Sequence, residues 1–315
     1  MIDISIIIPN YNTKNLLKQL IDSIYNNDTI HKLKYEIIVV DNNSSDGSVE
    51  YIKSLFKDIK LISNKKNLGY AKAVNQGYKI SRGEFIIICN SDIIVPKEFD
   101  FIRLINKFKS DEDIGVMGPQ LLYKNGSWQR SYGNVPNAKS ALKDLLFITK
   151  INELIEKINF KLNKQKEKQV SYIVGAFLIV RRSVFERLNG WDESFFFYAE
   201  DCDFCYRTQI QGFKVLFVPS FKVIHIGGSS SSAINVRKYK QIQARSNLLF
   251  VKKHFKKDLP KYILYRKIFC WIRLVIYYIV EKIRKKEVQK KFAFIGEIEG
   301  LKAEEKNNEC KKNYC

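Results

Sequence analysis

An acidic cluster at residues 200–207 is the part of this sequence best suited to chemistry. Glu200, Asp201 and Asp203 follow a run of aromatic residues, and Arg207 comes four positions after Asp203. If a helix begins at Asp201, the first two acids lie near its positive end, and Asp203 can pair with Arg207 on one face. A carboxylate in this position could act as a general base. The alternative is a capped surface helix with one ion pair, and the segment alone does not decide between the two.

Two further acids follow short apolar runs. Asp41 comes directly after the run 35–40, and Asp92 comes three residues after the run 85–89. Ligands of open α/β sheets bind at the carboxyl ends of strands, where an acid commonly holds a ribose or a base edge of a nucleotide. Asp92 could hold a hard divalent cation together with phosphate oxygens. The alternative for Asp41 is an Asx-turn that caps the next helix.

The order of the apolar segments predicts an α/β fold. Short apolar runs alternate with stretches of helical spacing, as in βαβ units with buried strands. The sequence has neither the P-loop of NTPases nor the G-x-G-x-x-G fingerprint of dehydrogenases. A metal must therefore supply positive charge beside any bound phosphate. The predicted strands of this part lie at 4–8, 35–40, 60–62 and 85–89.

Seven blocks of sequence carry a resemblance to a known family. They are ISIIIPNYN (4–12), VVDNNSSDGS (39–48), NLGYAKAVNQG (67–77), FIIICNSD (85–92), VGAFLIVRR (174–182), GWDESFFFYAEDCDFCYR (190–207) and VIHIGGSS (223–230). In this order they resemble family 2 glycosyltransferases, especially the rhamnosyltransferase-like branch of bacteria. The resemblance implies a GT-A fold, which is a Rossmann-like mixed sheet flanked by helices. It also implies a nucleotide-sugar donor, a divalent metal and transfer with inversion.

For the donor, the resemblance implies that the backbone around Pro9 and Tyr11 holds the base and that Asp41 holds the nucleotide. Asp92 is the last acid of the family's D-x-D-type motif and would bind metal and diphosphate. Asn90 replaces the first acid of that motif, so the metal, Mg²⁺ or Mn²⁺, would depend more on phosphate oxygens, water or a further ligand. The other residues assigned to the nucleotide-sugar site are Asn67, Gly69, Lys72 and Ser91.

The resemblance also implies the catalytic residues. The base of the family, the aspartate of its E-D pair, corresponds to Asp201 beside Glu200. His225 is the candidate further metal ligand, because some relatives use a histidine after this pair. Inverting transfer needs a carboxylate on one face of the sugar and positive charge for the diphosphate on the other. Arg207 is the strongest candidate cation to assist. The predicted acceptor contacts are Gly175, Ala176, Trp191 and Asp192, with core packing as the alternative for Trp191.

We predict a catalytic domain at residues 1–235, with a donor half at about 1–120 and an acceptor half at 121–235. A basic helical region that associates with membrane follows at 236–300, and a disordered tail at 301–315.

The acceptor half contains a Lys-rich pattern at 137–168 that predicts one long amphipathic helix, followed by a strand at 172–180. Cys202 and Cys205 have no second pair at a spacing suited to zinc, which favours free thiols in a reducing compartment. The N-terminus is acidic at Asp3 and resembles no signal peptide. We therefore expect an enzyme of the cytoplasm, bound peripherally to the inner face of the cell membrane.

Positive charge is concentrated near the C-terminus. Residues 237–291 contain 18 Lys or Arg and three acids, which is +15 of the chain's net charge of +21. The apolar run 268–280 within this region is shorter than the about 20 residues that span a bilayer. It fits an interfacial helix whose lysines meet anionic lipid. The alternatives are packing on the catalytic domain or the seam of a homodimer. Nucleic acid is not an expected partner, because no recognition motif accompanies the charge.

The leading hypothesis is an inverting glycosyltransferase that moves rhamnose or a hexose from a nucleotide-diphosphate donor to a hydroxyl of a lipid-linked glycan. A nucleotidyltransferase of similar fold would have no use for the E-D pair. The alternative from another class is a non-catalytic component of a polysaccharide assembly complex that binds nucleotide or docks on membrane.

Overall fold

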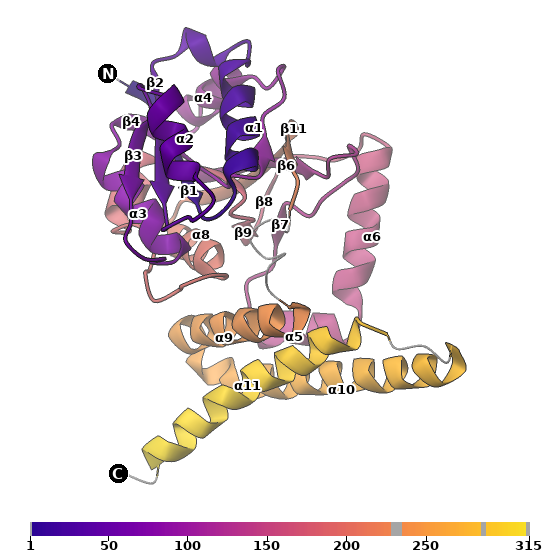
Figure 1. Ribbon diagram of the computed structural model, residues 1–315. Coiled ribbons are helices and arrows are strands. Elements are labelled where there is room, and N and C mark those ends of the chain that lie inside the picture. Colours follow the sequence, from indigo (N-terminus) through magenta and orange to yellow (C-terminus); the bar gives the residue numbers. More distant parts are fainter. Residues whose placement is uncertain (1, 228–234, 285–287, 313–315) are drawn as a thin grey trace. The chain divides into compact units, whose positions relative to one another are not determined.

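The computed structural model describes residues 2–227, 235–284 and 288–312 (Figure 1). The chain forms two compact units. The first, here called the sheet unit, comprises Met1–Asn134, Asn159–Phe196 and Glu200–Ser230. The second, the helical unit, comprises Val135–Ile158, Phe197–Ala199 and Ser231–Cys315. Residues 228–230, which end the seventh sequence block, lie outside the described residues.

The N-terminal half of the sheet unit consists of the predicted βαβ units. Strand β1 pairs in parallel with β2 and with β4, and β2 pairs in parallel with β3. The register places Asn10 beside Asp41, so the carboxyl ends of β1 and β2 meet at one edge of the sheet. The elements are β1 (Ile2–Asn10), α1 (Lys14–Tyr25), η1 (Ile30–Lys32), β2 (Tyr35–Asp41), α2 (Ser48–Leu55), β3 (Lys60–Ser63), α3 (Tyr70–Ile80) and β4 (Gly83–Cys89).

The second half of the sheet unit makes the sheet mixed. The strand order is β3-β2-β1-β4-β10-β6-β11-β5, with β8 beside β11 and a separate pair formed by β7 and β9. Strand β10 is antiparallel to both β4 and β6. The elements are β5 (Ile93–Ile94), α4 (Phe101–Lys109), β6 (Ile114–Leu122), β7 (Tyr132–Gly133), β8 (Lys168–Gln169), β9 (Tyr172–Ile173), β10 (Phe177–Arg181), α7 (Arg182–Arg187), α8 (Glu200–Ile210) and β11 (Lys214–His225).

Two pairings in this half position predicted site residues. Because β10 runs antiparallel to β4, the segment before β10 lies beside the loop after β4, and Asn90 N–H donates to Ala176 O at 2.9 Å. The antiparallel pairing of β11 with β5 sets His225 opposite Ile93, next to Asp92. Residues from three distant parts of the chain thus meet at the carboxyl edge of β4.

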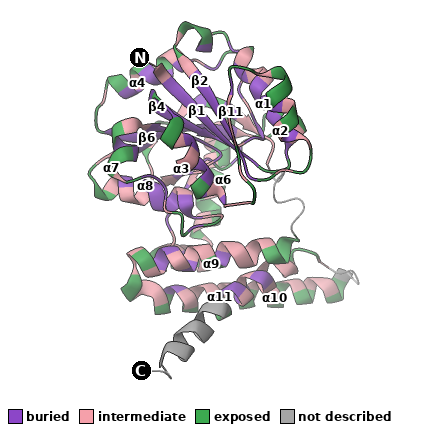
Figure 2. Cartoon of the chain, turned by 60° about the vertical axis from the view of Figure 1, so that its left-hand side comes forward, coloured by how far each residue is buried: buried purple, intermediate pink, exposed green. Residues whose placement is uncertain are grey.

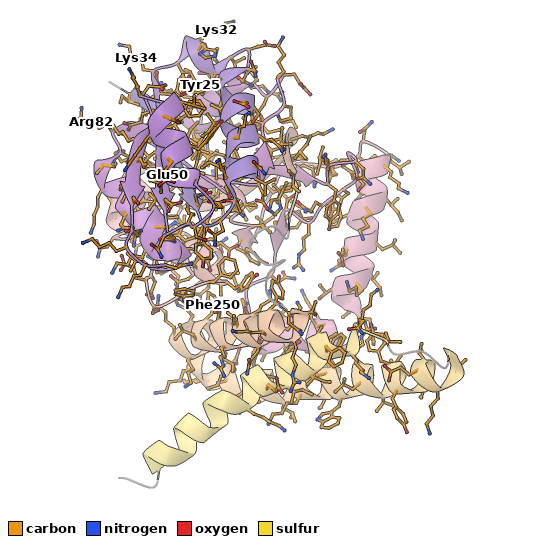
Figure 3. All side chains as sticks on the ribbon, in the orientation of Figure 1. Tyr25, Lys32, Lys34, Glu50, Arg82 and Phe250 are labelled. Carbon is orange, nitrogen blue, oxygen red and sulfur yellow. The ribbon has the colours of Figure 1, made fainter. Side chains whose placement is uncertain are left out.

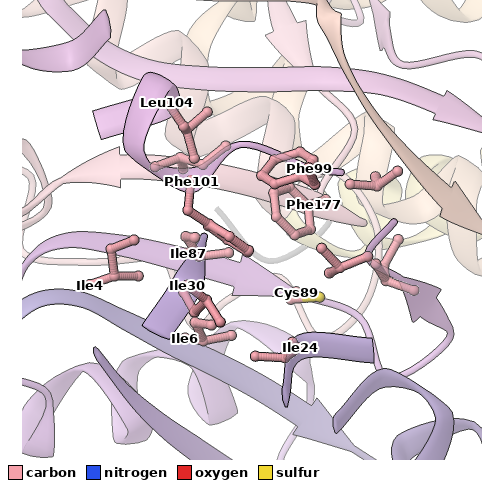
Figure 4. Packing of buried hydrophobic residues seen from close by; sticks show 14 of the residues in the cluster. Ile4, Ile6, Ile24, Ile30, Ile87, Cys89, Phe99, Phe101, Leu104 and Phe177 are labelled. Atoms are coloured by element: carbon pink, nitrogen blue, oxygen red, sulfur yellow. The ribbon is translucent and has the colours of Figure 1, made fainter. Parts of the chain in front are cut away.

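The sheet has a hydrophobic core on each face. Its central strands are largely buried (Figure 2). Side chains of a strand point alternately to the two faces, so Ile6 joins one core and Ile7 the other. Burial on both faces explains why the strands read as continuous apolar runs. Figure 4 shows Ile6 and Ile87 of the strands packed with Ile24 of α1. Charged side chains such as Lys34 lie on the outside of this unit (Figure 3).

The helical unit has a small core of its own. Arg266 pairs there with Asp144 and Glu297. Its core residues are Ala141, Leu248, Val251, Tyr262 and Leu301. Its elements are α5 (Ala138–Leu145), α6 (Ile148–Lys161, which continues into the sheet unit), α9 (Val236–His254), η2 (Lys256–Asp258), α10 (Leu259–Arg284) and α11 (Lys291–Lys312).

Three expected segments differ from the structure. The helix predicted at 137–168 is two helices, α5 and α6, because Phe147 adopts φ 60°, which a right-handed helix does not allow. The strand predicted at 172–180 is interrupted between β9 and β10 by Val174–Ala176, which turn toward the loop after β4. The expected tail at 301–315 instead continues α11 as far as Lys312, and Leu301 is buried. Residues 313–315 lie outside the described residues.

Candidate active site

Helix α8 begins at Glu200, one residue before the start considered from the sequence, and holds the carboxylate of Asp201 in a fixed orientation. Its Oδ2 accepts a hydrogen bond from Gly175 N–H at 2.9 Å, and its Oδ1 accepts one from Cys202 N–H at 2.8 Å. A Cβ on Gly175 would lie 3.2 Å from Asp201 Cβ, so glycine leaves the space that this contact needs. The two segments that carry Gly175 and Asp201 are therefore joined at the start of α8.

Glu200 is buried, with 7% of its surface exposed, and its Oε2 has no hydrogen-bond partner within the described residues. Burial, followed by repulsion from Asp201, raises the pKa of Glu200 well above its ordinary value. Burial also raises the pKa of Asp201, and the N–H bonds from Gly175 and Cys202 oppose this rise. The pair therefore retains a proton at higher pH than exposed carboxyls do. A raised pKa brings a carboxylate closer to the range in which a general base works well.

The stability of Glu200→Gln tests this burial. A buried acid whose folded-state pKa is raised contributes stability below its unfolded pKa and loses it as pH rises through the folded pKa. Glutamine removes the charge and keeps the shape. We expect Glu200→Gln to melt at a higher temperature than the parent at pH 8 and at nearly the same temperature at pH 4. The exposed Glu98 provides the control, since Glu98→Gln should shift neither melting point. The burial argument would be contradicted if the difference in Tm between Glu200→Gln and the parent were the same at pH 4 and pH 8.

Asp203 and Arg207 form the predicted ion pair, with 2.6 Å between Arg207 Nε and Asp203 Oδ2. The other two guanidinium nitrogens of Arg207 donate to the carbonyls of Leu188 and Gly190, both at 2.9 Å. All three nitrogens are thus engaged in holding the turn at 188–190 against α8. These contacts give Arg207 a structural role beside the one predicted for it.

The loop before α8 has an unusual backbone that sequence reasoning missed. Tyr198 and Ala199 adopt φ 71° and 64°, in the left-handed region that non-glycine residues rarely occupy. Within the helical unit, Ser246 Oγ donates to Phe197 O at 2.8 Å, and the ring of Tyr239 meets that of Tyr198 edge-on at 5.0 Å. Strained residues persist where neighbouring contacts hold them. No feature of the aromatic run indicated that its last residues belong to the helical unit.

Asp92 and His225 form the candidate metal pair, with 3.3 Å between Asp92 Oδ1 and His225 Nε2. His225 Nδ1 lies 2.9 Å from Gln129 Oε1, and Gln129 Nε2 donates to His225 O. In neutral imidazole, an Nδ1–H that donates to this amide oxygen leaves a lone pair on Nε2. That lone pair faces a carboxylate oxygen, so either a proton on Nε2 or a cation must lie between them.

The donor set fits a divalent cation of Mn²⁺ type, which accepts both imidazole and carboxylate ligands. Within residues 2–227, 235–284 and 288–312, no group of three His, Cys, Asp or Glu side chains is placed to hold a metal. The remaining ligands would come from water or from phosphate, as is usual for cations at phosphate sites. Gln129 was not among the predicted residues, because its amide acts through His225.

Asp41 is buried at the end of β2, and its carboxylate accepts three hydrogen bonds. Oδ1 accepts from Ser44 N–H at 2.8 Å, and Oδ2 accepts from Asn10 Nδ2 at 2.8 Å and from Ser44 Oγ at 2.6 Å. These are the bonds of the Asx-turn that the sequence left open as the alternative. Oδ1 accepts one of these bonds and keeps acceptor capacity for a nucleotide hydroxyl.

The other donor-side residues surround the same edge of the sheet. Pro9 is buried next to the end of β1, and Tyr11 is 41% exposed. Ser91 Oγ lies 2.7 Å from Thr13 Oγ1. Asn67 Oδ1 accepts from Gly69 N–H at 2.9 Å, and Lys72 makes an exposed ion pair with Glu193 at 3.5 Å.

The predicted acceptor residues separate into two groups. Gly175 and Ala176 lie beside Asp201 and Asn90, respectively. Trp191 is only 2% exposed and stacks on Phe204 with 5.8 Å between ring centroids, which is the core role left open by the sequence. Asp192 accepts from Ser194 N–H at 2.8 Å and so stabilises its own loop.

Comparisons with known proteins agree on the class. Residues 5–188 match the family "Glycosyl transferase family 2". Residues 100–280 match the family "Glycosyl transferase family group 2". The chain is 28% identical over 233 residues to rhamnosyltransferase WbbL of Escherichia coli, covering 70% of this chain and 82% of that protein.

Two further relatives are matched over less than two thirds of their own length. The N-acetylglucosaminyl-diphospho-decaprenol L-rhamnosyltransferase of Mycobacterium tuberculosis is 27% identical over 204 residues, which are 60% of this chain and 66% of that protein. The low-salt glycan biosynthesis hexosyltransferase Agl10 of Haloferax volcanii is 27% identical over 217 residues, which are 68% of this chain and 64% of that protein.

Solved structures share the fold. The mannosyltransferase PcManGT of Pyrobaculum calidifontis, in complex with GDP-Man and Mn²⁺, superposes with a TM-score of 0.59 at 16% identity, over 95% of this chain and 86% of that one. GalNAc-T7 with UDP, GalNAc and Mn²⁺ gives a TM-score of 0.58 at 18% identity, over 93% of this chain and 56% of that one. The mixed sheet with its flanking helices is thus the GT-A fold of glycosyltransferases, with a helical extension. The chain belongs to glycosyltransferase family 2, and its relatives include rhamnosyltransferases.

Proposed function

We propose that this chain is an inverting glycosyltransferase that transfers rhamnose or a hexose from a nucleotide-diphosphate donor to a hydroxyl of a lipid-linked glycan, in the synthesis of a cell-surface polysaccharide. The observation that carries the proposal is the carboxylate of Asp201, held by the N–H groups of Gly175 and Cys202 and raised in pKa by burial. The names of the relatives support the sugar class, and the decaprenol-linked substrate in one name supports the lipid-linked acceptor.

In the proposed reaction Asp201 accepts the proton of the acceptor hydroxyl. The hydroxyl oxygen forms a bond to the anomeric carbon while the bond from that carbon to the diphosphate breaks, and the nucleoside diphosphate leaves with the electron pair. Attack on the face opposite the leaving group inverts the configuration. Burial, followed by repulsion from Asp201, raises the pKa of Glu200 well above its ordinary value, which favours a single negative charge on the acidic pair.

Asp92 and His225 are the residues that would hold the divalent cation. When bound, the cation would stabilise negative charge on the departing diphosphate. Asp92 would supply a carboxylate ligand, and His225 would supply Nε2 in the tautomer whose Nδ1–H donates to Gln129.

We further propose that α10 docks on the anionic inner face of the cell membrane. No helix in the described parts of the chain is long and apolar enough to cross a bilayer. Apolar side chains of α10 are nevertheless exposed, including Trp271 at 58% and Val275 at 54%. Lys267 and Lys282 lie on the same helix and can meet lipid phosphates.

Charge placed on the apolar surface of α10 should release the protein from membrane. We expect the double variant Trp271→Glu and Val275→Glu to lose sedimentation with vesicles that contain phosphatidylserine, whereas the parent binds them and is released by salt. Leu55→Glu is the matched control, since Leu55 is an exposed apolar residue of the sheet unit at 63%. If the parent does not bind these vesicles but forms a dimer, and the double variant is a monomer, the apolar surface of α10 is a subunit interface instead.

The activity itself is tested with a panel of nucleotide sugars. We expect at least one sugar to be consumed in the presence of Mn²⁺ or Mg²⁺, with release of nucleoside diphosphate that chelator abolishes. A donor that binds but is never consumed, with any acceptor offered, would favour the non-catalytic component of an assembly complex.

A further inference from the structure

Tyr70, the first residue of α3, has a hydroxyl that the proposed reaction does not use. The hydroxyl donates to Asn90 Oδ1 at 2.7 Å and lies 3.1 Å from Gly175 O, which can only accept. Its backbone N–H donates to Phe196 O at 3.0 Å. One residue thus contacts the loop after β4, the segment before β10 and the loop that leads to α8.

The hydroxyl of Tyr70 remains a donor over the working range of pH. Burial, and then the charges of Glu200 and its neighbours, raise the pKa of Tyr70 well above its ordinary value. A single proton is shared between two acceptors, with the shorter bond to Asn90. The ring packs on Trp191 with 5.7 Å between centroids, which fixes the direction of the C–O bond.

The two acceptors belong to opposite ends of the candidate site. Asn90 lies two positions before Asp92, the predicted metal ligand, and its N–H donates to Ala176 O at 2.9 Å. Gly175 donates its own N–H to Asp201 Oδ2 at 2.9 Å. The hydroxyl therefore joins the end of the site that holds the cation to the end that holds the base.

We propose that Tyr70 is a positioning residue that sets the place of the base Asp201 relative to the metal ligand Asp92, through Gly175 on one side and Asn90 on the other. This inference rests on the proposed function. Transfer with inversion needs the attacking hydroxyl and the departing diphosphate on opposite faces of one sugar carbon. A displacement of about 1 Å in such an arrangement can cost on the order of a hundredfold in rate.

The test is Tyr70→Phe, which removes the hydroxyl and keeps the ring on Trp191. The matched control is Tyr78→Phe on the same helix, where the hydroxyl donates to Glu186 Oε1 at 3.0 Å and the ring stacks on Phe185. We expect Tyr70→Phe to lower kcat by about tenfold, the scale of one lost hydrogen bond, with the Kd of the donor changed less than about twofold. Tyr78→Phe should change neither.

Two readouts separate positioning from simple loss of stability. The bond from Gly175 N–H favours the charged form of Asp201, so its loosening in Tyr70→Phe should move the acid limb of the kcat profile to higher pH. Amide hydrogen exchange of the segment 174–176 should quicken in Tyr70→Phe and stay unchanged in Tyr78→Phe.

The outcomes distinguish this inference from the proposed function. A parent protein that consumes no nucleotide sugar contradicts the proposed function, while exchange at 174–176 still reports on Tyr70. Exchange at 174–176 that is the same in Tyr70→Phe and the parent would overturn the inference, as would an unchanged kcat and pH profile in an active enzyme.

Discussion

Asp201→Asn is expected to lower kcat by about a hundredfold or more while the Kd of the donor stays within about twofold of the parent. Asparagine keeps the size of the side chain, and its oxygen can still accept the N–H of Gly175, but it cannot take a proton from the acceptor. Steady-state kinetics with a consumed donor, together with calorimetric titration of that donor, measures both quantities.

Asp203→Asn is the comparison for this variant. Asp203 is fully buried and pairs with Arg207, so its substitution should lower Tm and leave the folded fraction active. An inactive Asp203→Asn beside an active Asp201→Asn would show that the base has been assigned to the wrong acid. The product should have the anomeric configuration opposite to that of the donor, and retention seen by NMR would reject direct displacement.

Asp92→Ala is expected to abolish metal-dependent turnover, with a loss of at least about a hundredfold in kcat. The alanine variant keeps the strand end but removes the carboxylate that faces His225 Nε2. Binding of Mn²⁺, followed by electron paramagnetic resonance in the presence of a nucleoside diphosphate, should weaken in parallel. Full activity of the parent in excess chelator would contradict the proposed metal chemistry.

Substitutions of His225 and of its partner Gln129 test the same metal site, with smaller expected effects. His225→Ala should weaken Mn²⁺ binding by removing one ligand. Gln129→Leu should weaken it by about tenfold to a hundredfold, the usual effect of losing a residue that orients a ligand. If neither variant alters Mn²⁺ binding, His225 and Asp92 form an ordinary proton-linked pair.

The strands and their terminal acids could be predicted because that information is local. Apolar runs of strand length, such as 85–89, end in turn-forming residues, and parallel strands bring their carboxyl ends to one edge. The spacing allowed a helix beginning at Asp201 with Asp203 paired to Arg207, and the structure has α8 begin one residue earlier, at Glu200, with that ion pair. The match of residues 5–188 to the family confirms the resemblance on which the fold and the enzyme class were based.

The side-chain contacts of the site could not be predicted in this way. His225 reaches Asp92 because β11 pairs with β5, a contact between segments about 130 positions apart in the sequence that no local pattern encodes. Gln129 contacts His225, and Tyr70 contacts Asn90 and the carbonyl of Gly175, so their own residue types carried no signal. Spacing also could not show that two nitrogens of Arg207 donate to carbonyls, or that Trp191 is core.

The anchored loop before α8 limits how this enzyme can be recombined with its relatives. Residues 197–199 are held by Ser246 and Tyr239, so the boundary of the helical unit is not a single position in the chain. A chimera joined near residue 235 would pair one parent's loop with another parent's α9. A chimera that keeps these contacts must exchange residues 197–199 together with α9, residues 236–254. Replacement of the C-terminal helices therefore requires a discontinuous crossover, and one of its pieces, 197–199, is adjacent to Glu200 and Asp201.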